Sequence, residues 1–372
     1  MIQPPLYRLA KARRHALLHA LCAGALLIMG LSSSQAAVVL QYHHISDETP
    51  ASTSTSPDLF AEHLAAIKRL NYQVVKLESL ASLLREGKAL PDKTVAITFD
   101  DGYSSVYDNA YPLLKQYGFP FTVFVNTAPI ERGSSLFVSW AQLNEMANDG
   151  ATIANHSHSH SHFLRKNNEE TDAEWRTRIG DDINITEALI TKHTGQQHGL
   201  LAYPYGEYNL AVQEIVAALN MLAFGQQSGP LNSIDHLQAL PRFPFGGRYG
   251  TVDDFVTKLK SVPMPLVSVA VTDDRGRPLN DVVLPQGHTK PQVSITLSDR
   301  HLAERVQCYA SGQGAIPVSV TGAVVHTIAT QDLPVARSRY NCTAPSEESG
   351  RYYWYSQLFI RKQPNGEWYP EE

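Results

Sequence analysis

A chain of 372 residues with 43% hydrophobic residues is long enough for two folded domains with sizeable cores. Residues 1–36 hold four of the 31 Lys and Arg residues and none of the 36 Asp and Glu, so the rest has 27 basic against 36 acidic residues, a net charge of −9. This balance argues against nucleic acid as a partner and is compatible with a neutral or cationic polymer.

The first 36 residues have the composition of a secretion signal. Basic side chains between positions 8 and 14 precede an apolar run at 16–31, and Ser34 and Ala36 place small residues where a signal peptidase cleaves. The run contains His19 and is short for a membrane span. We expect cleavage after residue 36 and a periplasmic or secreted protein without a transmembrane anchor. A retained anchor is the alternative.

Apolar strands alternate with amphipathic helices along residues 37–262, which we expect to form one domain. The predicted strands are 38–42, 73–76, 94–99, 121–125, 151–154 and 200–203. The predicted helices are 57–70, 77–85, 104–117, 141–148, 173–193, 210–220 and 252–259. Repeated strand and helix units predict an α/β fold, an irregular (β/α) barrel of parallel strands covered by helices.

The pattern changes after Pro263 and Pro265, and residues 263–372 are predicted to form a separate all-β sandwich. Its expected strands are 266–271, 292–297, 316–320, 323–328 and 352–360, and no helical period is evident. Cys308 and Cys342 fall in this region. In an exported chain they are expected to form a disulfide, with two buried thiols as the alternative.

Four consecutive aromatic residues, at positions 352–355, belong to the last predicted strand. Side chains alternate along a strand, so Tyr352 and Trp354 face one side while Tyr353 and Tyr355 face the other. We expect one pair in the core and the other available to stack on sugar rings. Core packing of all four is the alternative. Such a domain would bind substrate or dock onto another envelope protein.

Two adjacent carboxylates mark the end of the strand predicted at 94–99. Residues 98–103 read Thr-Phe-Asp-Asp-Gly-Tyr, so Asp100 and Asp101 emerge at the carboxyl end of a buried strand. Active sites of barrels collect at that end. Since side chains alternate, the two carboxylates should diverge, and one could hold a metal while the other handles protons.

A histidine tract follows the strand predicted at 151–154. His156, His158, His160 and His162 alternate with serines, and imidazoles four residues apart occur twice, as 156/160 and 158/162. This spacing suits two ligands of one metal on a helical turn. Two histidines with one carboxylate would leave a position open for water. A solvated histidine-rich loop is the alternative.

Residues 203–206, Tyr-Pro-Tyr-Gly, end another predicted strand. Pro204 and Gly206 restrict the backbone, so the amide of Tyr205 could point at an oxyanion. The rings of Tyr203 and Tyr205 could line a sugar groove. A simple Pro-Gly turn with packed aromatic residues is the alternative.

In this order and spacing, the stretches 98–103, 155–160 and 203–206 resemble the first three motifs of the polysaccharide deacetylases. These are the NodB-like enzymes of carbohydrate esterase family 4. The stretches 40–45 (Leu-Gln-Tyr-His-His-Ile) and 56–60 (Ser-Pro-Asp-Leu-Phe) resemble the exported members that act on poly-N-acetylglucosamine. The resemblance covers about residues 38–260.

The resemblance implies an irregular barrel, a divalent metal and roles for particular residues. It makes Asp100 the catalytic base, and Asp101, His156 and His160 the metal ligands. The metal implied is Zn²⁺, with Co²⁺, Ni²⁺ or Fe²⁺ as alternatives. Asn155 favours the 156/160 register over 158/162.

Three departures from the family pattern bear on catalysis. The chain has Ala202 where the third motif commonly begins with an arginine that orients the base. Arg242 could replace that arginine from a later strand end, and a surface or structural ion pair is the alternative. No Asp-x-x-Asp-Trp and no clear Leu-x-His segment supplies the general acid. His43 and His236 are candidates, with a structural or solvated histidine as the alternative for each.

The sequence therefore predicts a metal-dependent hydrolase that removes N-acetyl groups from a polysaccharide or oligosaccharide of N-acetylglucosamine in the cell envelope. Three alternatives stay open. A carbohydrate-binding pseudoenzyme would bind sugar without turnover, and an O-deacetylase would act on another exopolysaccharide. A metal-buffering protein would bind several metal ions through its histidine tract.

Overall fold

The computed structural model describes residues 36–232 and 235–370, and the side chain of Arg248 is not described. The expected secretion signal, residues 1–36, lies outside the described residues except for Ala36. Among the helices of the described part, none combines the length and the apolar character that crossing a membrane requires.

Eight strands, paired in parallel throughout, form the sheet that precedes residue 264. They are β1 Ala37–Tyr42, β4 Gln73–Val74, β5 Thr94–Phe99, β6 Thr122–Val125, β7 Thr152–Asn155, β8 Leu200–Ala202, β9 Leu222–Phe224 and β10 Phe243–Pro244. The order is β10-β1-β5-β6-β7-β8-β9, and β4 pairs with β5. β1 and β5 are buried along their whole length, as expected of parallel strands covered on both faces.

The segment between β9 and β10 closes this sheet into an irregular barrel. The amide of Ala223 donates to the carbonyl of Leu237 at 2.8 Å, and the amide of Gly225 donates to Leu240 at 2.9 Å. The same segment continues into β10, where Phe243 pairs with Leu40 of β1. The predicted fold class is therefore confirmed, and the closing segment carries Arg242 into the barrel wall.

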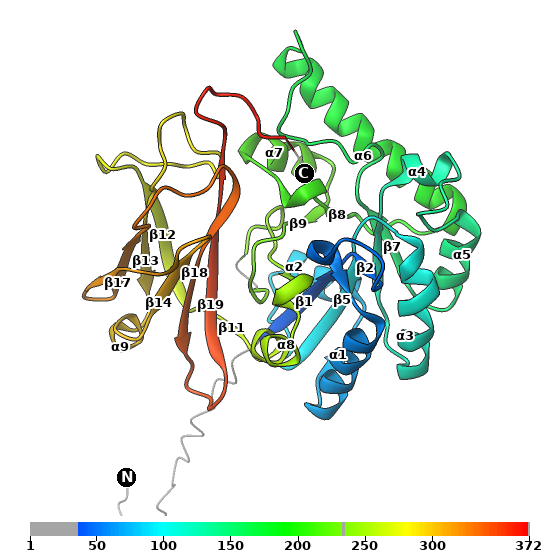
Figure 1. Cartoon of the computed structure of the whole chain (residues 1–372), viewed down its shortest axis with the longest axis horizontal. Helices are drawn as coiled ribbons and strands as arrows, with labels where there is room; N and C mark the ends of the chain where they lie inside the picture. Colours follow the sequence, from blue (N-terminus) through cyan, green and yellow to red (C-terminus); the bar gives the residue numbers. More distant parts are fainter. Residues whose placement is uncertain (1–35, 233–234, 371–372) are drawn as a thin grey trace, which may run out of the picture. The chain divides into compact units, whose positions relative to one another are not determined.

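Helices cover the outer side of the sheet (Figure 1). They are α1 Pro57–Arg69, α2 Leu77–Arg85, α3 Tyr111–Tyr117, α4 Thr127–Glu131, α5 Trp140–Asn148, α6 Asp172–Thr194, α7 Leu210–Ala218 and α8 Val252–Leu259. Shorter elements are β2 His44–Ile45, β3 Ser54–Thr55, the 3₁₀ turns η1 Ala51–Thr53, η3 Pro204–Gly206 and η4 Gly247–Tyr249, and the π-helical turn η2 Val106–Ala110. α1 begins as predicted, because the hydroxyl of Ser56 accepts from the amide of Leu59 at 3.1 Å.

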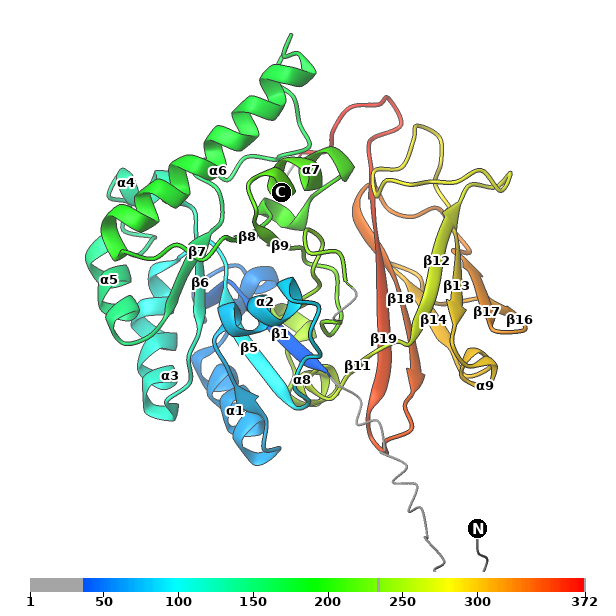
Figure 2. The ribbon, with the colours of Figure 1, turned by 180° about the vertical axis from the view of Figure 1, so that it is seen from behind.

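Two β-sheets make up residues 264–370, called here the C-terminal part, together with β11. One sheet has the order β11-β19-β18-β14-β15 and the other β12-β13-β17-β16 (Figure 2). Their bounds are β11 Val262–Pro263, β12 Leu266–Thr272, β13 Gln292–Leu297, β14 Gln307–Ala310, β15 Gly314–Ile316, β16 Val318–Thr321, β17 Val324–Ile328, β18 Ala336–Pro345 and β19 Tyr352–Arg361. Residues from both sheets share one apolar core, and a short helix, α9 Arg300–Ala303, adds a helical turn that the sequence did not predict.

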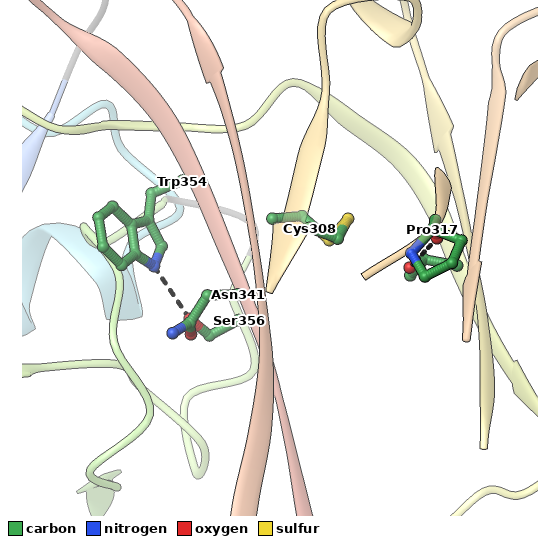
Figure 3. Close-up of a disulfide and its surroundings, with 7 residues drawn as sticks. Cys308, Pro317, Asn341, Trp354 and Ser356 are labelled. Carbon is green, nitrogen blue, oxygen red and sulfur yellow. Dashed lines mark hydrogen bonds between the residues drawn. A yellow bond between two sulfur atoms is a disulfide. The ribbon is translucent and has the colours of Figure 1, made fainter. Parts of the chain in front are cut away.

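The last strand, β19, packs on two sides. Tyr353 and Tyr355 contact the core between the two sheets, so the prediction of one core-facing pair is confirmed. Trp354 contacts Phe243 of β10 edge to face at a centroid distance of 5.2 Å. Its indole NH donates to Ser356, on the side of the sheet away from Cys308 (Figure 3). Trp354 therefore packs between sheet and barrel, but it is only partly buried and also lines a cavity, and Tyr352 is exposed. Stacking of this pair on sugar rings stays a prediction.

The predicted disulfide between Cys308 and Cys342 is present and joins β14 to β18. The two cysteines are 34 residues apart, a loop for which chain entropy gives about 4 kcal/mol of stabilisation.

We expect the Cys308→Ser/Cys342→Ser variant to lose about that much free energy of unfolding in urea. Unfolding of the wild type under reducing conditions should match the variant. Equal stability of variant and oxidised wild type would contradict the expectation.

His63 on α1 is fully buried and predicts a pH dependence of stability. Its Nδ1 lies 3.0 Å from the hydroxyl of Tyr42 and its Nε2 lies 2.8 Å from the carbonyl of Gly250. Burial lowers the pKa of His63 to about 4, against about 6.5 in the unfolded chain. Between these values the unfolded chain binds the proton, so the free energy of unfolding should fall as the pH drops from about 6.5 to about 4.

His63→Gln tests this pH dependence, because an amide can bond to both partners without titrating. We expect a shallower decrease of the free energy of unfolding of the variant over that interval. Parallel pH profiles of variant and wild type in urea unfolding would contradict the assignment.

Candidate active site

The two adjacent carboxylates leave the end of β5 in different directions. The amide of Asp100 donates to the carbonyl of Tyr42 at 2.8 Å and so extends the pairing of β5 with β1. Asp101 has φ 71°, a left-handed conformation that turns the chain sharply. Each carboxylate therefore meets a different set of partners, as alternation along the strand predicts.

Asp100 forms a buried, bidentate ion pair with Arg242. Nη1 and Nη2 of Arg242 each donate to one carboxylate oxygen at 2.7 Å, and Nε2 of Gln41 donates to Oδ2 at 2.7 Å. Arg242 is itself held by the carbonyl of Gly225 at 3.1 Å and the hydroxyl of Thr98 at 3.2 Å. Both charged side chains are 0% exposed, so this is not a surface pair. Parallel N–H···O bonds of this kind fix the orientation of a carboxylate.

Arg242 also sets the charge state of Asp100. Burial by itself would raise the pKa of this carboxyl, but the guanidinium of Arg242 and the imidazole of His156 outweigh it and hold the pKa below its ordinary value. Asp100 is therefore an ionised carboxylate at neutral pH, with one side fixed by donors.

Asp101, His156 and His160 form a group that could hold a metal ion, called here the metal-binding group. Oδ1 of Asp101 lies 3.4 Å from Nε2 of His156 and 3.1 Å from Nε2 of His160. All three ligand atoms lie within 4.8 Å of one another. Nδ1 of His156 faces the carbonyl of Ala202 at 2.8 Å, which fixes the proton on Nδ1 and leaves Nε2 as a ligand atom. These residues fit a divalent metal that takes two nitrogens and one oxygen.

The other two histidines of the tract have different partners. Nδ1 of His158 lies 2.8 Å from the hydroxyl of Thr127, and Nδ1 of His162 lies 2.8 Å from a carboxylate oxygen of Glu207. Asp182 on α6 accepts from the amide of His158 at 2.5 Å and so holds the loop. The structure therefore brings the 156/160 pair, and not the 158/162 pair, to Asp101.

Tyr205 lies beside the histidines in a left-handed turn. Its φ is 60°, its ring stacks on His162 at 3.8 Å between centroids, and it contacts His160 at 4.6 Å. Gly206 follows with φ +69°, and a Cβ there would lie 2.6 Å from Cγ of Gln226. Only glycine fits this close approach, so the turn is fixed against the loop after β9.

Tyr203 and Pro204 support this turn from inside. Both are buried, and the hydroxyl of Tyr203 donates to the carbonyl of Gln238 at 2.8 Å. Of the two tyrosines expected to line a groove, only Tyr205 is partly exposed.

The two candidate histidines for the general acid lie in different places. His43 follows β1, and its Nδ1 is buried without a hydrogen-bond partner among the described residues. Burial lowers the pKa of His43, and the charges of Asp101 and Asp100 oppose that shift, which places the ring near both carboxylates. His236 is exposed and lines a cavity of about 730 Å³ beside β12 and β19, which includes neither Asp100 nor the metal-binding group.

Sequence reasoning missed three residues that shape the site. Gln41 bonds to Asp100, Tyr103 bonds to Asp101 and stacks on His44 at 3.6 Å, and Glu207 bonds to His162. A polar residue inside the apolar stretch 37–42 was an available signal for Gln41. For Glu207, the available signal was its position directly after the Tyr-Pro-Tyr-Gly stretch.

A known protein family matches the middle part of the chain. Residues 87–224 match the sequence model of the family Polysaccharide deacetylase. The chain is 29% identical over 242 residues to a protein of Escherichia coli (strain K12) named poly-beta-1,6-N-acetyl-D-glucosamine N-deacetylase. The match covers 55% of this chain and 36% of that protein, so the chain spans about a third of the length of this curated relative.

Two solved structures have a similar fold. Streptococcus pyogenes deacetylase PplD, solved in complex with acetate, gives a TM-score of 0.55 with 24% identity over 61% of this chain and 99% of that one. IcaB from Ammonifex degensii gives a TM-score of 0.51 with 25% identity over 58% of this chain and 94% of that one. Both cover a share of this chain close to that of residues 37–262.

The buried pair of Asp100 and Arg242 predicts a large effect of removing one partner. Arg242→Met would leave a carboxylate buried without its main donors, and we expect a loss of about 3–5 kcal/mol in free energy of unfolding. Removing both charges in Asp100→Asn/Arg242→Met should recover part of that loss. Arg176→Met is the control, since its ion pair with Glu214 is exposed and should contribute under about 1 kcal/mol. Urea unfolding measures all three, and an Arg242→Met variant as stable as wild type would contradict the account.

Proposed function

We propose that this chain, which carries a polysaccharide deacetylase domain, is a metal-dependent hydrolase that removes N-acetyl groups from a polymer or oligomer of N-acetylglucosamine. The observation that carries the proposal is the pairing of two unlike carboxylates in one place: Asp100 held by Arg242, and Asp101 facing two histidines. The names of the Escherichia coli relative and of its Staphylococcus aureus counterparts support the substrate.

In this proposal, Asp101, His156 and His160 hold the metal, and together with Asp100 they are called the reaction centre. Two imidazole nitrogens and one carboxylate oxygen favour Zn²⁺, and Co²⁺, Ni²⁺ or Fe²⁺ are the other candidates. Such an ion, when bound, polarises the acetyl carbonyl and lowers the pKa of water. The carbonyl of Ala202 orients His156 for this task.

Asp100 would act as the general base. Its ionised carboxylate accepts the proton of the attacking water, while Arg242 and Gln41 keep it oriented. The backbone amide of Tyr205, on the turn beside His160, would contact the oxyanion that forms as water adds to the acetyl carbon. Arg242 thereby takes the role of the arginine that the third motif lacks at Ala202.

His43 would be the general acid that completes the reaction. Because burial lowers the pKa of His43, its ring would first take up the proton that Asp100 removes from water and then pass it to the leaving nitrogen. As the bond between the acetyl carbon and the nitrogen breaks, the amine leaves with a proton and the acyl group leaves as acetate. The position of His43 at the end of β1, near both carboxylates, supports this role, whereas His236 faces a different cavity.

We expect His43→Asn to retain metal and to lower kcat by about a hundredfold.

The division of the chain belongs to the same proposal. Residues 37–262 would form the catalytic domain and residues 263–372 an accessory domain, with the boundary inside β11, which pairs with β19. After removal of residues 1–36 the protein would act in the periplasm or outside the cell. The accessory domain would bind substrate or dock onto an envelope protein partner.

Acetate release from N-acetylglucosamine oligomers tests the function directly. Chelation should abolish release, and one equivalent of Zn²⁺ should restore it. An O-acetylated polysaccharide is assayed in parallel, and faster release from it would favour the O-deacetylase. Metal and sugar binding without acetate from either substrate would favour the carbohydrate-binding pseudoenzyme. Binding of several ions per chain would point to metal buffering.

A further inference from the structure

The C-terminal part turns two arginines toward the barrel. Along β18, alternate side chains from Ser338 to Ala344 are buried on one face, and most of them belong to the core between the two sheets. Period-two alternation therefore places Arg337 and Arg339 on the opposite face of the strand. Arg337 contacts the loop that follows β8, and Arg339 contacts the loop that follows β9.

Arg337 binds a carboxylate that has no exposed surface. Its Nη1 donates to Oε1 of Glu207 at 2.7 Å, and the hydroxyl of Tyr369 donates to the same oxygen. The other oxygen of Glu207 faces Nδ1 of His162 at 2.8 Å. A buried carboxylate is stable only where donors surround it, and two of these three donors come from the C-terminal part.

His162 connects this network to the reaction centre. Its ring lies parallel to that of Tyr205, with 8° between the planes, and Tyr205 in turn contacts His160. The guanidinium carbon of Arg337 lies 5.5 Å from the centre of the Tyr205 ring. Two of the groups around Tyr205, His162 and Arg337, are therefore held by Glu207.

Arg339 supports the neighbouring loop. Its Nη1 donates to the carbonyl of Gln226 at 2.9 Å. The same loop accepts from Arg242 twice, through the carbonyls of Gly225 and Gln227 at 3.1 Å each. The loop that fixes the partner of Asp100 is thus also anchored to β18.

We propose that the C-terminal part is a structural component of the reaction centre, in which Arg337 and Tyr369, through Glu207 and His162, position Tyr205 for the acetyl group. The kinetic consequence rests on the proposed function, whereas the structural consequence rests on the contacts alone. Arg337 and Tyr369 are positioning residues, since they act through Glu207.

Loss of Arg337 should affect turnover more than binding. Without its guanidinium, Glu207 lacks one donor and the turn at 203–207 shifts or loosens. A displacement of about 1 Å at a reacting group can cost on the order of a hundredfold in rate. Arg337 acts on the metal-binding group through Glu207, His162 and Tyr205 and not as a ligand, so we expect the affinity for Zn²⁺ to change less than kcat.

The test compares Arg337→Gln with Arg351→Gln in the zinc-loaded full chain. Arg351 is a matched control, since it also joins the C-terminal part to the barrel, through Asp92 at 2.8 Å. We expect Arg337→Gln to lower kcat on N-acetylglucosamine oligomers about ten- to a hundredfold, with KM changed less than about threefold. Arg337→Lys should recover part of kcat, and Arg351→Gln should keep kcat.

Backbone hydrogen exchange gives a second readout that needs no turnover. We expect faster exchange in segments 157–164 and 203–209 for Arg337→Gln and not for Arg351→Gln. Unchanged kcat and unchanged exchange in Arg337→Gln would overturn the proposal. If the wild type releases no acetate, the proposed function fails and exchange alone decides whether Arg337 positions the turn. Should Arg337→Gln not fold, Tyr369→Phe, which removes one hydroxyl, decides by the same readouts.

Discussion

The ion pair between Asp100 and Arg242 is the constraint on which the arrangement of the site depends. A carboxylate and a guanidinium that are both fully buried must meet with good geometry, because neither can be hydrated. Arg242 reaches Asp100 only because the segment after β9 crosses to β1 and closes the barrel. The segment that closes the barrel therefore also orients the carboxylate of Asp100.

The strands β18 and β19 link the C-terminal part to the barrel. β18 and β19 each have one face on the core between the sheets and one face on the barrel. An accessory domain that served only to hold the polymer would not need to bind the buried carboxylate of Glu207. The C-terminal part contacts the site at two places. Arg337 contacts the turn with Tyr205 through Glu207, and Arg339 contacts the loop that holds Arg242.

Local patterns in the sequence were enough to predict the barrel, the all-β region and the disulfide. They also identified the carboxylate and histidine stretches of the site. These features depend on periodicity and on residues close in sequence. Among the strands that these patterns missed, β9, β10, β14 and β18 are short or rich in polar residues, so their pairing is set by distant partners. Arg242 could be named only as a candidate, and the contact of Arg337 with Glu207, 130 residues apart, left no local signal.

The central claim is that Asp100 and Asp101, though adjacent, do different work. The most direct measurement is metal content together with acetate release for Asp100→Asn and Asp101→Asn, side by side. The account predicts that Asp100→Asn keeps one metal ion per chain and releases no acetate, whereas Asp101→Asn loses the metal. Acetate release by Asp100→Asn at a rate near that of the wild type would contradict it.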